Sequence, residues 1–272
     1  MKLTRYQTAT GSRWALDDHL LDKRTTLAAL LAMRRDDLFA SFDSVDVTES
    51  ADAALPLQTP VEDGFEVWAC GVTYLSSRVA REAESASADV YARVYDADRP
   101  EVFFKASGWR VVGHGQPVRT RRDSDWDVPE PELVLVVNRH GEIVGYSAGN
   151  DLSSRAIEGE NPLYLPQAKT YDGSCAVGPS IVLLPDGQVG EQPIRLAIER
   201  GGERVYDEKA DTSQMKRSFE ELVEYATREL AFPHGLFLMT GTCLVPGDNF
   251  TLQAGDRISI TVGELQLVNT VA

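Results

Sequence analysis

The sequence predicts a β-rich α+β fold with a large C-terminal domain and a small N-terminal one. Residues 101–200 read as short apolar runs separated by turn residues, which is typical of strands joined by turns. Helical spacing is confined to a few separate stretches, so a doubly wound parallel sheet or a (β/α)8 barrel is disfavoured. The stretch LPLQTPVEDG, residues 55–64, has the composition of a linker. We therefore place the N-terminal domain at residues 1–62 and the C-terminal domain at residues 63–272.

The first part of the chain predicts two helices and a strand. Residues 25–39 have leucines at helical spacing and a threonine available as N-cap; the leucines are Leu27, Leu30, Leu31 and Leu38. Residues 65–74, FEVWACGVTY, predict a buried strand that runs into a glycine turn. Residues 76–96 are rich in alanine and charged side chains, which favour a helix.

The rest of the chain predicts mostly strands. The strand runs are residues 101–107, 109–113, 132–138, 142–151, 180–187 and 194–202. An amphipathic helix is predicted over 213–230, with apolar positions at Met215, Phe219, Leu222, Val223, Ala226 and Leu230. Residues 252–271 predict a β-hairpin with Gly-Asp and Gly-Glu turns.

Composition narrows the classes of partner. The formal net charge is −15, which disfavours nucleic acid and anionic membranes as partners. No apolar run reaches the ~18 residues of a membrane span, and the N-terminal residues lack the apolar core of a signal peptide. The three cysteines form no CxxC pair and predict a reduced, cytoplasmic location. The four histidines form no HxH or HExxH pair, so oxygen ligands and a hard cation are expected at any metal site.

Two glutamates open the most apolar predicted strand, within DVPEPELVLVVNRHG at residues 127–141. The run LVLVV is apolar on both faces, as in a strand that is buried on both sides. Side chains two residues apart point to the same face, so Glu130 and Glu132 would lie side by side at the edge of a dry core. Two ionised carboxylates there repel each other and are costly to desolvate. A divalent cation would offset both costs, and so would exposure at the wet end of a strand.

Asp151 and Lys169 favour the cation. Asp151 ends the predicted strand that follows LVLVV across the turn NRHG, and adjacent antiparallel strands bring such residues close together. Three carboxylates from two strands form a hard-cation site with positions left for water and substrate. Lys169, in LPQAKTYDGSCAVGP, is a candidate acid or base because burial and a nearby metal lower the pKa of a lysine.

Four segments resemble the fumarylacetoacetate hydrolase superfamily in order and spacing: VPEPELVLVV, GYSAGNDLSSR, QAKTYDGSCAVGP and LQAGDRISITVGELQLVNTV. The resemblance covers about residues 65–272 and implies a mixed β-sandwich roll as the core. It implies that Glu130, Glu132 and Asp151 bind Mg²⁺, with Mn²⁺ or Ca²⁺ as alternatives, and that Lys169 lies at the substrate. The two glutamates would then face a cation.

One segment departs from the hydrolases of this superfamily. These carry G-x-N-Y-x-x-H-x-x-E after the first core strand, and their His–Glu pair activates the water that cleaves a C–C bond. This chain has GVTYLSSRVA, with Ser77 at the histidine position and Ala80 at the glutamate position, so hydrolysis lacks its base. The segments GVTYLSSRVAREAES and IEGENPLYLPQAK instead resemble the sugar-acid dehydratase branch, of the 2-dehydro-3-deoxy-D-arabinonate type. That branch uses a glutamate, which corresponds to Glu101, in acid–base work.

The resemblance implies a hydro-lyase of oxidative pentose degradation. The metal would chelate the carboxylate and the 2-keto oxygen of a 2-keto-3-deoxy sugar acid and acidify its C3 protons. Either Lys169 or Glu101 would remove a C3 proton, and the other would protonate the departing C4 hydroxyl. Loss of water and tautomerisation then give 2-oxoglutarate semialdehyde. The sequence leaves the two assignments open. No organic cofactor is required.

Four further residues are predicted to contact the substrate. Phe103 would line the pocket, and Lys105, on the same strand face as Glu101, would bind the substrate carboxylate. Ser77 would bind substrate hydroxyls or cap the helix that follows it. Thr242, in MTGTCLVPG, resembles the substrate-binding Gly-Thr of the family.

Two other functions stay open at this point. A metal-dependent acylpyruvate hydrolase or oxaloacetate decarboxylase would use the same enolate chemistry, and a non-catalytic metal-binding β-protein would need neither Lys169 nor an enclosed pocket. The sequence does not fix the C4 stereochemistry or the length of the sugar acid. The resemblance also implies a homodimer or homotetramer, which would cover exposed sheet edges.

Overall fold

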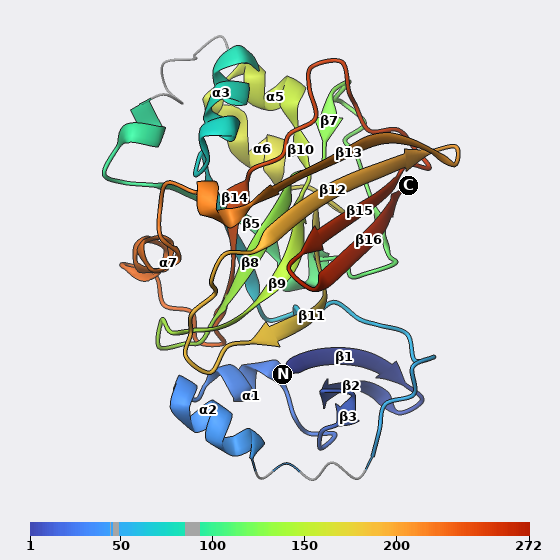
Figure 1. Cartoon of the computed structure of the whole chain (residues 1–272), viewed down its shortest axis with the longest axis vertical. Helices are drawn as coiled ribbons and strands as arrows, with labels where there is room; N and C mark the ends of the chain where they lie inside the picture. Colours follow the sequence, from blue (N-terminus) through green and yellow to red (C-terminus); the bar gives the residue numbers. More distant parts are fainter. Residues whose placement is uncertain (44, 46–48, 85–92) are drawn as a thin grey trace.

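Two β-sheets form the body of the protein (Figure 1). The computed structural model describes residues 1–43, 45, 49–84 and 93–272. The larger sheet has nine strands, in the spatial order β3 (His19–Leu20), β2 (Gly11–Leu16), β1 (Lys2–Thr8), β11 (Cys175–Leu183), β9 (Ile143–Asp151), β8 (Pro131–Val137), β14 (Leu236–Thr242), β4 (Glu66–Gly71) and β5 (Glu101–Ser107). The smaller sheet has five, in the order β13 (Glu203–Asp211), β12 (Pro193–Arg200), β15 (Arg257–Val262), β16 (Leu265–Val271) and β6 (Pro117–Val118). Two short strands, β7 (Asp127–Val128) and β10 (Ser153–Ser154), pair separately.

The helices are short and lie around the sheets (Figure 1). Helices α1 (Leu27–Leu31) and α2 (Arg35–Phe42) lie beside β1, β2 and β3, and α7 (Phe219–Thr227) flanks the larger sheet. Helices α3 (Leu75–Glu84), α5 (Arg155–Glu160) and α6 (Leu165–Lys169) gather at one end of the molecule. Single 3-10 turns are η1 (Gly108–Arg110), η2 (Pro162–Tyr164) and η3 (Thr212–Gln214). Within the described residues, no helix is long and apolar enough to cross a membrane.

The predicted fold class is confirmed. The sheets are mixed: β14 pairs with β4 and β16 with β6 in parallel, whereas neighbours such as β8 and β9 are antiparallel. Strands and helices do not alternate along the chain, so the fold is not doubly wound.

Strand β8 is buried on both faces, as its sequence predicts, and all seven of its residues are buried. Leu133 and Leu135 pack into the apolar core that includes residues of β12 and β15. Val134 and Val136 point the other way, into the core formed with β1 and α1. This central position explains why LVLVV shows so little alternation.

Strand β1 pairs with β11 through Lys2 and Val182, so the N-terminal strands extend the larger sheet. Their side chains share one apolar core with β8; examples are Leu3, Trp14 and Leu16. The boundary between residues 62 and 63 stays a prediction.

The prediction of one helix over residues 25–39 is wrong. Thr26 does cap α1, accepting a hydrogen bond from the Ala29 amide at 3.1 Å. However, the helix ends at Leu31, before α2 begins. Residues of the turn after β8 form the main-chain hydrogen bonds there, in place of a continuous helix. The Arg139 amide donates to the Leu31 carbonyl at 3.0 Å, and Glu142 accepts from the Arg35 amide at 2.8 Å. Tertiary hydrogen bonds therefore override the helical pattern.

Two more elements differ from prediction. Residues 109–113 form no strand, because η1 takes their start and only Val112 makes a bridge, to Ala176. The helix predicted over 213–230 is limited to α7 and begins after the N-cap Ser218, so Leu230 is 46% exposed instead of packed. In the helix predicted over 76–96, α3 covers the start and residues 93–96 are helical, whereas 85–92 lie outside the described residues.

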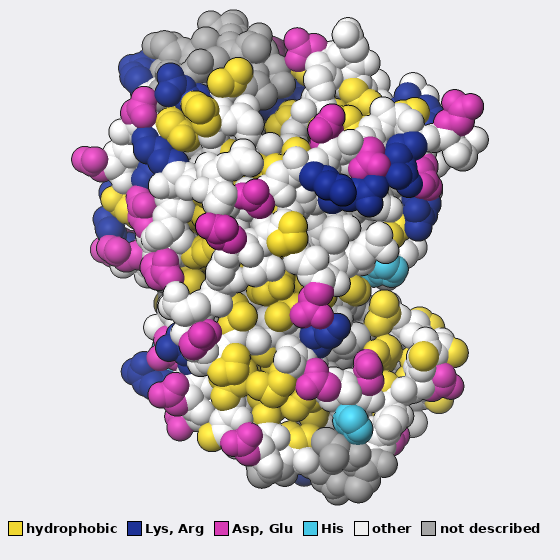
Figure 2. All heavy atoms as spheres, in the orientation of Figure 1, with side chains coloured by type: hydrophobic (Ala, Val, Ile, Leu, Met, Phe, Trp, Pro, Cys, Tyr) yellow, Lys and Arg dark blue, Asp and Glu magenta, His cyan; other side chains and the backbone are white. Residues whose placement is uncertain are grey.

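The other predicted strands are confirmed to within a few residues, although β11 begins earlier than predicted, at Cys175. The sequence pattern does not indicate β1, β2 or β13. Strand β13 is a largely exposed edge strand with charges on both faces, so it lacks an apolar period. On the face in Figure 2, basic side chains lie among acidic ones. Arg195 and Arg204 of the smaller sheet, for example, both pair with Asp207.

Candidate active site

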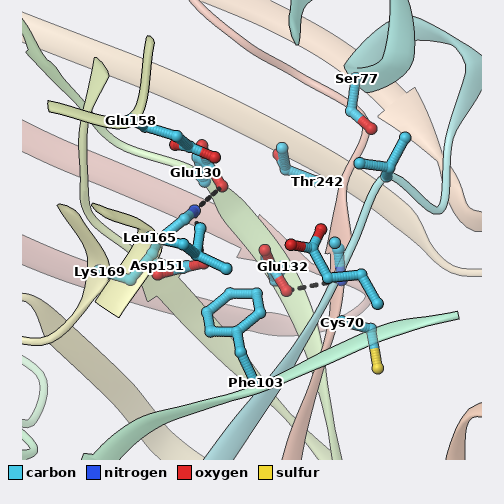
Figure 3. A pocket seen from close by; sticks show the side chains of 14 residues that line it. Cys70, Ser77, Phe103, Glu130, Glu132, Asp151, Glu158, Leu165, Lys169 and Thr242 are labelled. Carbon is cyan, nitrogen blue, oxygen red and sulfur yellow. Dashed lines mark hydrogen bonds and ion pairs between the residues drawn. The ribbon is translucent and has the colours of Figure 1, made fainter. Parts of the chain in front are cut away.

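A small pocket opens at the end of the larger sheet where β4, β9 and β14 finish and β5 and β8 begin (Figure 3). Helices α3, α5 and α6 cover it. The strands of a mixed sheet bring residues from distant parts of the sequence to one edge, so each strand contributes one or two side chains. The lining residues are Cys70, Gly71, Val72, Ser77, Glu101, Phe103, Glu130, Glu132, Asp151, Glu158, Leu165, Lys169, Gly241 and Thr242.

The structure brings Glu130, Glu132 and Asp151 together. Each offers a carboxylate oxygen, and these oxygens lie within 4.8 Å of one another. The pairing of β8 with β9 causes this, because the Asp151 amide donates to the Glu130 carbonyl at 2.9 Å. All three side chains are buried. This is the convergence that the turn between the two predicted strands led us to expect.

Hydrogen bonds fix two of these carboxylates. Glu130 accepts from Ser153 Oγ at 3.0 Å, and it makes ion pairs with Arg155 at 3.0 Å and Lys169 at 2.7 Å. Glu132 accepts from the Gly241 amide at 2.6 Å. These contacts orient both carboxylates.

Gly241 can hold Glu132 because it is a glycine. Its φ of 96° lies in the left-handed region, and a Cβ there would overlap the hydroxyl of Thr73. A register shift in β14 between Met239 and Thr242 turns its amide toward Glu132. The bulge therefore forms part of the site.

The cluster has the donor set of a hard cation. Burial, followed by the charges of Asp151 and Glu130, raises the pKa of Glu132 well above its usual value. Lys105, Lys169 and Arg155 pair with Asp151 and Glu130. The three carboxylates are nevertheless buried close together, and a divalent cation would offset the repulsion between them. Buried oxygen donors of this kind fit a hard divalent cation.

Lys169 reaches the cluster from the last residue of α6. Its ammonium pairs with Glu130 at 2.7 Å and with Asp151 at 2.8 Å, and it lies 5.7 Å from the centre of the Phe103 ring. The side chain is only 3% exposed. The predicted acid–base lysine therefore lines the pocket beside the carboxylates, and Phe103 is on the pocket wall as predicted.

Glu101 also lines the pocket. It lies at the start of β5, directly opposite Gly71 of β4. A Cβ at residue 71 would overlap the Glu101 carboxyl, so the glycine leaves the space that this carboxyl fills.

Ser77 and Thr242 lie across the pocket from Lys169 (Figure 3). Ser77 is buried on α3 and donates to the Tyr74 carbonyl at 3.1 Å. Thr242 donates to the Leu244 carbonyl at 3.0 Å. A hydroxyl that donates one hydrogen bond still has acceptor lone pairs, so Ser77 and Thr242 can both accept hydrogen bonds from substrate hydroxyls.

Lys105 is placed differently from the prediction. Its side chain is fully buried and does not line the pocket. The ammonium pairs with Asp151 and donates to the carbonyls of Leu152 at 2.9 Å and Lys169 at 2.6 Å. An ammonium has three N–H donors, and three acceptors lie against this one. Direct binding of a substrate carboxylate is therefore not what this geometry supports.

The prediction missed Arg155, Glu158 and Gly241. Arg155 and Glu158 are three residues apart on α5, which places them on one helix face. The segment NDLSSRAIEGE contains a sequence signal for Arg155 and Glu158, because an Arg and a Glu three residues apart follow shortly after Asp151. No such signal marks Gly241.

The cysteines are not nucleophiles here. All three are buried and unpaired, and burial raises the pKa of Cys175 and of Cys243 to about 12. Burial also raises the pKa of Cys70, which lines the pocket. The thiols are neutral at pH 7.

Comparison with known families decides the classification. The family described as "Fumarylacetoacetate (FAA) hydrolase C-terminal" matches residues 66–272. The chain belongs to the fumarylacetoacetate hydrolase family. This match confirms the resemblance seen in the sequence, and it includes every predicted site residue.

Members of the fumarylacetoacetate hydrolase family that resemble this chain include two dehydratases. The chain is 52% identical over 221 residues to the "Probable 2-keto-3-deoxyxylonate dehydratase" of Haloferax volcanii, covering 81% of this chain and 76% of the relative. It is 41% identical over 208 residues to the "2-dehydro-3-deoxy-D-arabinonate dehydratase" of Saccharolobus solfataricus, covering 75% of this chain and 70% of the relative.

A solved structure in the same family has the whole fold. It is titled "2-keto-3-deoxy-D-arabinonate dehydratase complexed with magnesium and 2,5-dioxopentanoate", and it superposes with a TM-score of 0.83 at 32% identity. The match covers 100% of this chain and 98% of that one, so it includes the N-terminal strands as well as the family domain.

Proposed function

We propose that the protein is a Mg²⁺-dependent hydro-lyase that dehydrates a 2-keto-3-deoxypentonate to 2,5-dioxopentanoate (2-oxoglutarate semialdehyde) in oxidative pentose degradation. The observation that carries this proposal is the joining, in one pocket, of the Glu130–Glu132–Asp151 cluster with Lys169 and Glu101. The dehydratases at 41% and 52% identity support the reaction, and the neighbour with magnesium and 2,5-dioxopentanoate supports the metal and the ligand.

The three carboxylates would hold the metal. When bound, Mg²⁺ supplies Lewis-acid polarisation of a 2-keto acid, which makes the C3 protons easier to remove. Its charge would also offset the repulsion between these carboxylates and an anionic substrate. The Gly241 amide, Ser153 and Arg155 keep Glu132 and Glu130 oriented for this role.

Lys169 and Glu101 perform the proton transfers. Both line the pocket, and they come from different elements, α6 and β5. One removes the C3 proton, and the other protonates the C4 hydroxyl as the C–O bond breaks, so water leaves without net consumption of a proton. Tautomerisation of the resulting C3–C4 unsaturated 5-hydroxy acid then gives the C5 aldehyde of 2,5-dioxopentanoate. A positioned acid or base contributes about 10²–10⁴-fold to the rate.

Ser77 and Thr242 bind substrate hydroxyls, and Phe103 closes the apolar side of the pocket beside Lys169. Within the described residues, no histidine lines the pocket, and Ser77 occupies the position of the base that a C–C hydrolase needs. Elimination of a β-hydroxyl requires no activated water. The same pocket is therefore suited to dehydration and poorly suited to hydrolysis.

A substrate panel tests the proposal. Purified protein with Mg²⁺ is assayed on 2-keto-3-deoxypentonates of both C4 configurations, on a 2-keto-3-deoxyhexonate and on acylpyruvates, with a coupled dehydrogenase that reports 2,5-dioxopentanoate. We expect fast, EDTA-sensitive dehydration of a pentonate and slow acylpyruvate cleavage. Ready acylpyruvate cleavage with every 2-keto-3-deoxy acid left unchanged would refute the proposal in favour of a hydrolase.

We also propose that the protein is a homodimer or homotetramer and works in the cytoplasm. Apolar side chains that are exposed in the single chain, such as Leu75 (55%) and Leu163 (84%), support a covered surface near the pocket. Light scattering at micromolar concentration tests this, and a sharp 29.9 kDa species would contradict it.

A further inference from the structure

We infer that Lys105 is a positioning residue, which fixes Asp151 and Lys169 relative to each other and does not touch the substrate. The inference deepens the proposed function, because it takes the role of Lys169 from that proposal. It concerns how the acid–base lysine and a carboxylate of the cluster are kept in register.

The contacts of Lys105 join two parts of the site. Its ammonium pairs with Asp151 Oδ1, whereas the ammonium of Lys169 pairs with Asp151 Oδ2 at 2.8 Å. The Asp151 carboxylate is therefore held between two lysines. The same Lys105 ammonium donates to the carbonyls of Leu152 at 2.9 Å and Lys169 at 2.6 Å. One buried cation thus fixes the end of β9 and the end of α6 together.

Lys169 is consequently held at both its main chain and its side chain. Its carbonyl accepts from Lys105 and also from Ser174 Oγ at 2.9 Å, and its ammonium pairs with Glu130 and Asp151. Since α6 is only five residues long, its own hydrogen bonds define the direction of Lys169 weakly. The external donors supply the missing constraint.

Strand β5 extends this coupling to the second acid–base candidate. Alternate residues of β5 are Glu101, Phe103 and Lys105, which share one strand face. Glu101 and Phe103 line the pocket, and Lys105 lies behind it. Thr170, next to Lys169, adds a hydrogen bond to the Phe104 carbonyl at 3.2 Å. Lys105 therefore sets the spacing between the strand that carries Glu101 and the helix that carries Lys169.

Lys105→Met tests the inference, because methionine fills similar space without donors or charge. The readouts are dehydration and the Mg²⁺-dependent exchange of C3 hydrogens for deuterium in 2-oxobutanoate. Exchange needs only enolisation. At saturating Mg²⁺ we expect kcat to fall about 10²-fold in both assays, as for a reacting group displaced by about 1 Å, with KM within about 3-fold of wild type. In a crystal structure of the variant, the Lys169 ammonium should no longer contact both Glu130 and Asp151.

Ser174→Ala is the second variant, in case Lys105→Met does not fold. It removes the other donor to the Lys169 carbonyl and should lower kcat about 3- to 10-fold, again with KM unchanged. Arg200→Met is the matched control: it removes a cation from the buried Asp256, outside the pocket, and should lower Tm without changing kcat.

Three results would overturn the inference. One is a rise in KM at unchanged kcat for Lys105→Met, which a substrate ligand would produce. Another is a lower Tm with unchanged kcat in both variants, which a purely structural residue would produce. The third is a crystal structure with Lys169 still in place. Failure of the proposed function can be told apart from failure of this inference. If the wild type exchanges C3 hydrogens but dehydrates no sugar acid, the proposed function is wrong, and the exchange rates of wild type and Lys105→Met still test the role of Lys105.

Discussion

Two regions of this protein bury carboxylates, and they offset the cost of removing these charges from water in different ways. Asp256 is fully buried and meets one guanidinium: Arg200 contacts both of its oxygens at 2.7 Å, and the Gln253 amide adds a bond at 2.9 Å. That carboxylate is satisfied within the protein. In the pocket, Glu130, Glu132 and Asp151 offer oxygens within 4.8 Å of one another, and all three line a cavity.

The difference separates a structural ion pair from a functional one. A buried pair with matched charge and complete hydrogen bonding offsets the cost of desolvation, whereas like charges buried together add repulsion to that cost. The pKa of Glu132 is raised because burial and two neighbouring carboxylates, Asp151 and Glu130, disfavour its anion. The ionised cluster therefore lowers the stability of the fold, and a bound metal would restore it.

The largest expected effect follows from removing one negative charge of the carboxylate cluster. Glu132→Gln keeps the shape of the side chain and its bond from the Gly241 amide but removes an anionic oxygen ligand. We expect Mg²⁺ binding, measured by calorimetry, to weaken at least 10²-fold and activity to fall to that of the EDTA-treated wild type. Wild-type activity in the metal-stripped variant would refute the metal site.

The next effect tests chemistry without removing a ligand. Lys169→Ala should lower kcat by about 10²–10⁴-fold, because proton transfer is lost while the three carboxylates remain. Mg²⁺ binding should persist, and calorimetry checks this on the same sample. A variant that loses its metal together with its activity would show that Lys169 acts through the cluster instead.

The third effect contrasts the two regions directly through stability. Asp256→Asn breaks a matched pair and should lower the free energy of unfolding by about 1–3 kcal/mol, with kcat unchanged at temperatures where the protein is folded. Glu132→Gln should raise Tm in EDTA, since it removes like-charge repulsion. Urea unfolding and calorimetric Tm measure the two changes. If both variants lower stability equally, repulsion among the carboxylates of the cluster does not destabilise the metal-free fold.

The smallest effect is a pH dependence of the metal-free protein. Because the pKa of Glu132 is raised on folding, the folded state binds more protons than the unfolded state above the usual glutamate value of 4.5. The contribution of Glu132 is therefore fully present below pH 4.5 and is lost as pH rises through the raised pKa. In EDTA, the Tm advantage of Glu132→Gln over wild type should grow as pH rises from about 4.5 to 8. A constant difference would contradict the shift.

The sequence predicts the centre of the site better than its surroundings. The convergence of Glu130, Glu132 and Asp151 was predictable because a period-two pattern and a short turn fix which side chains lie together. The role of Lys105 was not predictable from the sequence. Strand alternation places its side chain on the face of Glu101 but does not say whether its ammonium reaches the pocket. Three acceptors from β9 and α6 decide that, and they are distant in sequence.

The same reason explains the errors in the fold. The central strand β8 and the hairpin of β15 and β16 have strong apolar periods and were predictable. The break between α1 and α2 depends on two partners more than a hundred residues away: the Arg139 amide, which donates to Leu31, and the Glu142 carboxylate, which accepts from Arg35. Strand β13 is an exposed edge strand, so its sequence has no alternation of apolar and polar residues that would predict it. Local patterns predict local structure, and tertiary partners override them.

Gly71 and Glu101 face each other across β4 and β5, and the carboxyl occupies the space that a side chain at residue 71 would need. A side chain at residue 71 would therefore move the Glu101 carboxyl out of its present position on the pocket wall. Among related sequences that retain the glutamate, residue 71 should remain glycine, and a larger residue should appear there only together with a shorter side chain at 101. A directed-evolution library that varies residue 71 alone would recover few active clones, whereas one that varies the pair can reshape this wall of the pocket.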